Sequence, residues 1–100
     1  MAERGQIKGA IVDGPLALDV AFSEESARIK GIPSPVAGDA DILVFPNIES
    51  GNIFFKSCTY LSRGELGAVV VGAKCPCVLT SRGDSDDTKF YSIALGSLLA

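Results

Sequence analysis

The feature that most constrains the fold is an alternation of short apolar runs with longer amphipathic segments. The apolar runs are rich in β-branched residues and end at glycine, proline or polar residues, as buried strands do. They cover residues 9–13, 41–45, 67–72 and 77–80. The segments between them carry helix-capping residues or apolar residues at three- and four-residue steps, and predict helices over about 15–30, 48–63 and 84–99. This alternation predicts one α/β unit across residues 1–100, a mostly parallel sheet with helical crossovers.

Two local details extend this prediction. Gly31 follows a run of helix-forming residues and is expected to end that helix. In the last helix, apolar residues at helical spacing predict the buried face. That face consists of Phe90, Ile93, Ala94 and Leu98.

Composition excludes several classes of function. The nine basic residues are dispersed in a chain of net charge −3, which argues against nucleic-acid binding. No histidine is present, so a Ser-His-Asp or Cys-His arrangement cannot form within this chain. Three cysteines are too few for a tetrahedral zinc site without further ligands. The odd cysteine count and the lack of a secretion signal predict a cytoplasmic protein, and no apolar run is long enough to span a membrane.

The octet at residues 80–87 (TSRGDSDD) concentrates chemistry in one turn before a predicted helix. Ser81 and Arg82 suit an anion site, because a guanidinium offers a fork of donors and a helix N-terminus attracts negative charge. The same octet also suits a solvated helix cap, with Asp84 or Ser85 as the capping residue. Both interpretations stand on these residues alone.

Two further polar turns follow predicted strands. Asp13 and Gly14 come after the first strand, and 46–47 come after the second. In parallel sheets, ligands bind beyond the carboxyl ends of the strands. These turns and the octet are therefore expected to line one edge of the sheet.

Four stretches together resemble the phosphate acetyl/butyryltransferase family, and the butyryltransferase branch in particular. They are residues 12–19 (VDGPLALD), 34–41 (SPVAGDAD), 46–53 (PNIESGNI) and 79–86 (LTSRGDSD). The resemblance runs from about residue 8 to the end of the chain. It implies that residues 1–100 correspond to the C-terminal third of a two-domain enzyme whose fold resembles isocitrate and isopropylmalate dehydrogenases.

The reaction implied by the resemblance is butyryl-CoA plus phosphate giving butyryl phosphate plus CoA. Coenzyme A is then a substrate, and no metal or other cofactor is implied. Family members usually form homo-oligomers. Basic residues that the family uses lie outside the matched part, so the chain alone is expected to be inactive.

The resemblance also implies site residues. Ser81 donates a hydrogen bond to the reacting group, and Arg82 binds phosphate or coenzyme A. The position that holds the catalytic aspartate in acetyl-transferring relatives is Thr88 here, which leaves Asp86 or Asp87 as the base. Gly51 and Asn52 match a family motif that faces the cleft.

Two alternatives remain open at this stage. One is the acetyltransferase branch of the same family. The other is a non-catalytic α/β domain that dimerises. A general nucleotide-binding module is disfavoured, since the chain has neither a P-loop nor a Gly-x-Gly-x-x-Gly pattern.

Overall fold

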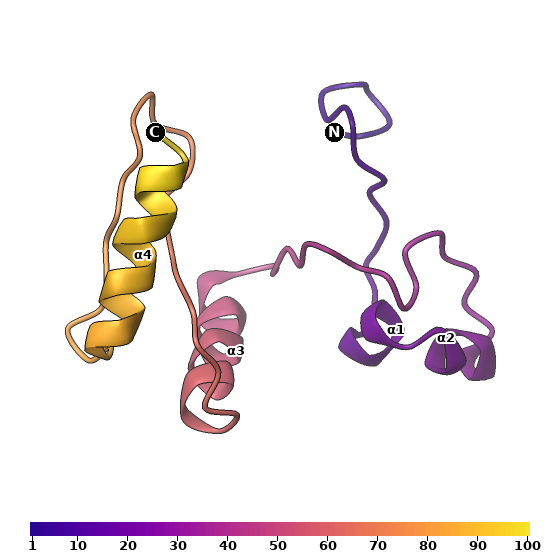
Figure 1. The fold of residues 1–100 in the computed structure, drawn as a ribbon. Helices are drawn as coiled ribbons and strands as arrows, with labels where there is room; N and C mark the ends of the chain where they lie inside the picture. Colours follow the sequence, from indigo (N-terminus) through magenta and orange to yellow (C-terminus); the bar gives the residue numbers. More distant parts are fainter. The chain divides into compact units, whose positions relative to one another are not determined.

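The structure is a computed structural model that describes residues 1–100, and all its regular elements are helices (Figure 1). The chain divides into two compact units, Met1–Val44 and Phe45–Ala100. Unit 1 contains α1 (Leu18–Phe22) and α2 (Glu24–Lys30), and unit 2 contains α3 (Ile48–Tyr60) and α4 (Asp86–Leu98). None of these helices is long and apolar enough to cross a membrane.

The predicted α/β fold with a mostly parallel sheet is wrong for this chain. Its β-structure is one isolated antiparallel bridge, in which the Val70 N–H donates to the Cys77 carbonyl at 2.8 Å. Residues of the predicted second strand stay in solvent: Ile42 is 80% exposed and Val44 90%. The physical reason is that a strand depends on pairing with a neighbour. An apolar run indicates residues that suit a sheet, but it does not supply a partner.

Unit 1 is organised by the two ends of α2. The Ser23 hydroxyl caps its first turn by accepting from the Ser26 N–H at 3.1 Å. Gly31 ends the helix in the left-handed conformation, with φ of 64°, as predicted. The N–H of Ile32 then donates back to the carbonyl of Ala27 at 3.0 Å. Local capping residues therefore fix both ends of this short helix.

The loop after α2 closes over α1. The Gly38 N–H donates to the Val20 carbonyl at 3.1 Å, and the Ala40 N–H donates to the Ala21 carbonyl at 3.4 Å. Val20, Ala21 and Ala27 are the buried apolar residues of the chain. Gly38 is required at this approach, because a Cβ there would lie 2.7 Å from the backbone nitrogen of Glu24.

In unit 2 an extended segment lies along α4 (Figure 1, orange beside yellow). A Cβ on Gly67 would meet the Tyr91 carbonyl oxygen at 3.0 Å, and one on Gly96 would meet the Val78 side chain at 2.7 Å. Between these two close contacts with α4, Ser92 is fully buried, and its hydroxyl accepts from the Ala68 N–H at 3.0 Å. Small side chains thus allow the backbone to come close to the helix.

The buried face of α4 consequently differs from the predicted one. Thr88, Ser92 and Gly96 are buried at four-residue spacing. Phe90, Ile93 and Leu98 are 66%, 61% and 84% exposed. The prediction failed because apolar spacing does not reveal that the neighbour is a backbone segment, which needs small residues and hydrogen-bonding groups opposite it.

Both units expose large apolar side chains. In unit 1, Ile11 is 70% exposed and Ile29 75%. In unit 2, Ile48 is 82% exposed and Leu61 81%.

Candidate functional site

The octet forms a closed turn followed by the start of α4. The Asp84 N–H donates to the Ser81 carbonyl at 3.1 Å. In the opposite direction, the Ser81 N–H donates to the Asp84 carboxylate at 2.8 Å. The turn is therefore tied at both ends by the same two residues, and it holds Arg82 and Gly83 between them.

The Ser81 hydroxyl is oriented by the backbone of Gly83 in the same turn. Its oxygen accepts a hydrogen bond from the Gly83 N–H at 3.4 Å. A hydroxyl that accepts in this way keeps its proton to donate elsewhere. Ser81 is exposed, so that proton can reach a ligand. Arg82 at the tip of the turn is also exposed and has no acidic partner.

Asp84 connects this turn to α3. One carboxylate oxygen accepts from the Lys56 ammonium at 3.0 Å, and the other accepts from the Ser81 N–H. The Asp84 side chain is 8% exposed, whereas that of Lys56 is 32% exposed. The hydrogen bond from Lys56, followed by that from the Ser81 backbone, lowers the pKa of Asp84 below its ordinary value. Asp84 is therefore a part-buried carboxylate with a cationic partner.

The first turn of α4 carries the other two carboxylates of the octet. Ser85 is the cap, since its hydroxyl accepts from the Thr88 N–H at 3.2 Å. Asp86 forms an exposed ion pair with Lys89 at 3.3 Å. Asp87 has no ion-pair partner and faces a hollow of about 460 Å³. The two predicted candidates for the base therefore lie in different surroundings.

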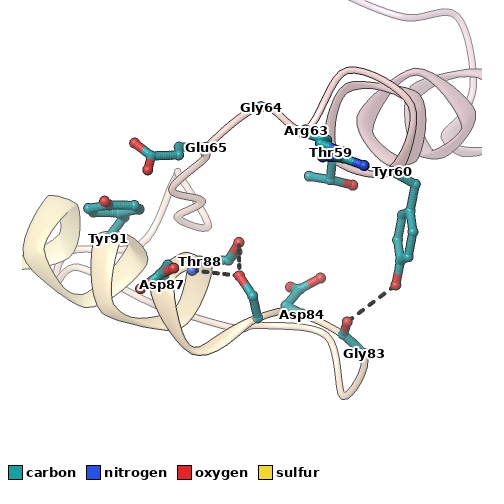
Figure 2. Close-up of a pocket in the computed structure, with 11 residues that line it drawn as sticks. Thr59, Tyr60, Arg63, Gly64, Glu65, Gly83, Asp84, Asp87, Thr88 and Tyr91 are labelled. Atoms are coloured by element: carbon teal, nitrogen blue, oxygen red, sulfur yellow. Dashed lines mark hydrogen bonds between the residues drawn. The ribbon is translucent and has the colours of Figure 1, made fainter.

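Figure 2 shows the residues around this hollow. The end of α3 supplies Tyr60, whose hydroxyl donates to the Gly83 carbonyl at 3.3 Å. Tyr91 of α4 lies across from Glu65, and the negative charge of Glu65 raises the pKa of this tyrosine. Ser81 and Arg82 belong to the same turn as Gly83 but lie outside the lining of the hollow. The hollow thus opens beside the Ser81–Arg82 turn and not around it.

Gly51 and Asn52 lie in the first half of α3. A Cβ on Gly51 would stand 3.6 Å from the Phe45 side chain, so this glycine packs against the entry to the helix. Asn52 is exposed. Asn52, Lys56 and Tyr60 follow one another at four-residue steps, and therefore share one face of α3. Since Lys56 and Tyr60 both contact the octet, Asn52 occupies the next turn of the same face.

Asp13 and Gly14 belong to unit 1. The Gly14 N–H donates to the Asp13 carboxylate at 2.8 Å. Hydrogen bonding from the Ser34 side chain, and then from the Gly14 backbone, lowers the pKa of Asp13. Both residues are exposed. The Asp13 carboxylate is thus held by contacts within unit 1, with no sheet edge beside it.

Sequence reasoning missed Lys56 and Tyr60, and it considered Asp84 only as a cap. The available signal was the four-residue spacing of Asn52, Lys56 and Tyr60, which puts three polar groups on one helix face. No cluster of three or more histidine, cysteine, aspartate or glutamate side chains is arranged to hold a metal ion.

The comparisons with known proteins identify the family of this chain. A family model described as phosphate acetyl/butaryl transferase matches residues 1–97. The chain belongs to this family of acyl-transferring enzymes.

Its similarity extends to both named branches. It is 57% identical over 100 residues to the phosphate acetyltransferase of Thermotoga maritima, covering 100% of this chain and 34% of that protein. It is 56% identical over 100 residues to the phosphate butyryltransferase of Clostridium acetobutylicum, covering 100% of this chain and 33% of that protein. The chain therefore spans about a third of the length of the curated relatives that it matches.

A solved structure is similar to the fold as well. A crystal structure of a branched-chain phosphotransacylase from Enterococcus faecalis matches with a TM-score of 0.82 at 45% identity. The match covers 96% of this chain and 36% of that chain. The backbone arrangement of this chain therefore recurs within a larger protein.

Proposed function

We propose that this chain is part of a phosphate acyltransferase that interconverts acyl-CoA plus phosphate with acyl phosphate plus coenzyme A. The proposed acyl group is butyryl, on the four stretches that resemble the butyryltransferase branch. The chain is 57% identical to a phosphate acetyltransferase and 56% identical to a phosphate butyryltransferase. Because these identities are nearly equal, the acetyl group is the second candidate. The observation that carries the proposal is the turn that presents an unpaired guanidinium beside a donating hydroxyl, in a chain of this family.

Arg82 is the proposed phosphate ligand. Its guanidinium stands at the tip of a closed turn without an acidic partner, three residues before the capping residue Ser85. A planar guanidinium binds two phosphate oxygens at once through paired hydrogen bonds. The free N–H groups at the start of α4 add positive potential on the same side.

Ser81 is the proposed donor to the reacting carbonyl. In the direction that consumes acyl phosphate, the sulfur of coenzyme A forms a bond to the acyl carbon. The bond from that carbon to the phosphate oxygen breaks, and phosphate leaves. Negative charge develops on the carbonyl oxygen between these events, and a pre-oriented hydroxyl stabilises it. The hydrogen bond from Gly83 to the Ser81 oxygen supports this role, because it leaves the hydroxyl proton available.

Asp87 is the proposed base that takes the thiol proton. Asp86 is paired with Lys89 and points to solvent, with a fully exposed side chain. Asp87 is unpaired and lines the hollow beside the turn, where a thiol has room to enter. A carboxylate base must lie within hydrogen-bond reach of its proton, and this position favours Asp87 over Asp86.

Two further sets of residues are proposed to bind substrate. Asn52 stands about 6 Å along α3 from Lys56, given a rise of ~1.5 Å per residue, on the face that contacts the octet. Gly51 keeps the adjacent position free of a side chain. Within unit 1, Asp13 and Gly14 are the proposed substrate-binding residues.

We propose a cytoplasmic homo-oligomer. Three free cysteines support a reducing compartment. The exposed apolar side chains of both units support assembly, since exposed apolar patches mark surfaces that contact other protein segments. The same observation favours the second candidate function, a non-catalytic dimerising unit. Light scattering should therefore report a species larger than a monomer, and a stable monomer would contradict the assembly.

An activity measurement separates the two candidates. A chimera is made in which this chain replaces the matching 100 residues of the Thermotoga maritima phosphate acetyltransferase. Acyl phosphate and coenzyme A are supplied, and the loss of free thiol is followed. We expect turnover in the chimera and little in the isolated chain. Arg82→Ala should lower the turnover of the chimera about 100-fold, the size of effect seen when one charge-stabilising donor is removed. An inactive chimera would favour the non-catalytic unit.

A further inference from the structure

Asp84 is the one carboxylate of the octet that is part-buried, and the chemistry above gives it no part. We infer that Asp84 is a positioning residue: held by Lys56, its carboxylate fixes the backbone of Ser81 and thereby the directions of the Ser81 hydroxyl and the Arg82 guanidinium. This inference rests on the proposed function of that turn. In this inference α3 orients a turn that is distant in sequence, since Lys56 and Asp84 are 28 residues apart.

The two carboxylate oxygens have separate partners. One accepts from Lys56 at 3.0 Å and the other accepts from the Ser81 N–H at 2.8 Å. A single carboxylate therefore joins a helix to the residue that precedes Arg82. Without it, the Ser81 N–H would lose its acceptor, and the turn would keep only the bond from the Asp84 N–H to the Ser81 carbonyl. Such a turn leaves the direction of the next side chain loosely defined, and a displacement of about 1 Å can lower a rate about 100-fold.

Lys56 also neutralises the negative charge that Asp84 brings to the turn. An unpaired carboxylate beside Arg82 would attract the guanidinium and repel phosphate. The ammonium of Lys56 neutralises Asp84 from the α3 side and leaves Arg82 free. Tyr60 on the same face of α3 adds a second tether through its bond to the Gly83 carbonyl. The helix thus contacts Gly83 and Asp84, the two residues that follow Arg82 in the turn.

The test uses the chimera and separates two properties of the Asp84 side chain: its role as acceptor for the Ser81 N–H and its negative charge. Asp84→Ala removes both interactions. With acyl-CoA and phosphate as substrates and the release of free thiol followed, we expect kcat/KM to fall about 100-fold with the KM for phosphate raised at least tenfold. Asp84→Asn retains an oxygen for the Ser81 N–H. When combined with Lys56→Met, which removes the orphaned charge, it should stay within about fivefold of the parent. A merely structural role would reduce the amount of folded enzyme and leave KM unchanged.

A charge reversal makes the distinction sharper. Lys56→Asp with Asp84→Lys restores an ion pair, but a lysine cannot accept from the Ser81 N–H. We expect thermal stability to recover and the KM for phosphate to remain raised. A reversed pair that restores the parental KM would overturn the inference. If Arg82→Ala leaves activity unchanged, the proposed function fails. If Arg82→Ala lowers activity and Asp84→Ala does not, the inference alone fails.

A second measurement needs no activity. In an NMR titration of this chain to acid, the Ser81 amide proton should move as Asp84 takes up its proton. The same signal should stay still in Asp84→Asn. In Lys56→Gln the midpoint should move to higher pH, because the ammonium that favours the carboxylate is gone. A Ser81 amide signal that does not respond in the parent chain would overturn the inference.

Discussion

The two units bury different kinds of residue. Unit 1 encloses Val20, Ala21 and Ala27, which are the buried apolar residues of the chain. Unit 2 encloses Thr88, Ser92 and Gly96, and its helix faces a backbone segment. One unit is therefore held by apolar contacts and a tight loop, and the other by hydrogen bonds and close backbone approach.

This difference bears on function. The residues of unit 2 that carry the proposed chemistry are polar and exposed, and a network of bonds from α3 to the octet fixes them. A network of this kind sets directions accurately but contributes little net stability, because each hydrogen bond replaces one made to water. We therefore expect substitutions in unit 1 to change mainly stability, and substitutions in the octet to change mainly phosphate binding and turnover.

The largest expected effect on stability is in unit 1. Gly38→Ala places a Cβ 2.7 Å from the Glu24 backbone nitrogen, at a residue with φ of 76°. The left-handed conformation and the clash together should lower the free energy of unfolding by about 2–4 kcal/mol. Urea denaturation followed by circular dichroism measures this change.

Gly31→Ala is the matched control for that substitution. Gly31 has φ of 64° and nothing within 4 Å of a built Cβ, so only the backbone conformation is penalised. We expect a loss of about 1–2 kcal/mol. Equal losses at both glycines would show that the loop does not close over α1 as described.

A smaller effect is expected in unit 2. Ser92→Ala removes the bond to the Thr88 carbonyl at 2.7 Å and leaves the Ala68 N–H without its acceptor. An unpaired amide at a buried contact lowers the free energy of unfolding by about 1–3 kcal/mol. The amide of Ala68 should also exchange with solvent faster, which hydrogen-exchange NMR detects.

Ser97→Ala is the matched control on the same helix. Ser97 donates to the Ile93 carbonyl at 2.9 Å in the way that Ser92 donates to Thr88, but it is exposed and accepts nothing. We expect a change within about 0.5 kcal/mol, as for most surface substitutions. If the two serines behave alike, the contact between the extended segment and α4 is not what stabilises unit 2.

The helices could be predicted from sequence because their signals are local. Ser23, Asn47 and Ser85 each accept from an N–H three residues ahead, and Gly31 ends α2 as predicted. The sheet could not be predicted correctly, because strand pairing depends on partners distant in sequence. The run at 67–72 instead provides one bridge residue and two close contacts with α4.

The residues of the candidate site likewise divide into those that local sequence predicts and those that depend on the fold. Ser81 and Arg82 could be selected from their own turn, since both the chemistry and the family stretch lie within a few residues. Lys56 could not be connected to Asp84 across 28 residues without the fold. The choice between Asp86 and Asp87 likewise depended on Lys89, which pairs with one of them and leaves the other beside the hollow.

The central claim is that the Ser81–Arg82 turn binds phosphate, and the chimera with Arg82→Ala tests it most directly. The control is Arg28→Ala, which removes the same charge from an exposed ion pair with Glu25 in unit 1. With acyl-CoA and phosphate as substrates, the account predicts that Arg82→Ala lowers turnover about 100-fold and raises the KM for phosphate, as expected when a charge-assisted ligand is lost. Arg28→Ala should leave the turnover and the KM for phosphate within about twofold of the parent values, since surface ion pairs contribute little to stability. Equal effects of the two substitutions, or an unchanged phosphate KM in Arg82→Ala, would contradict the account.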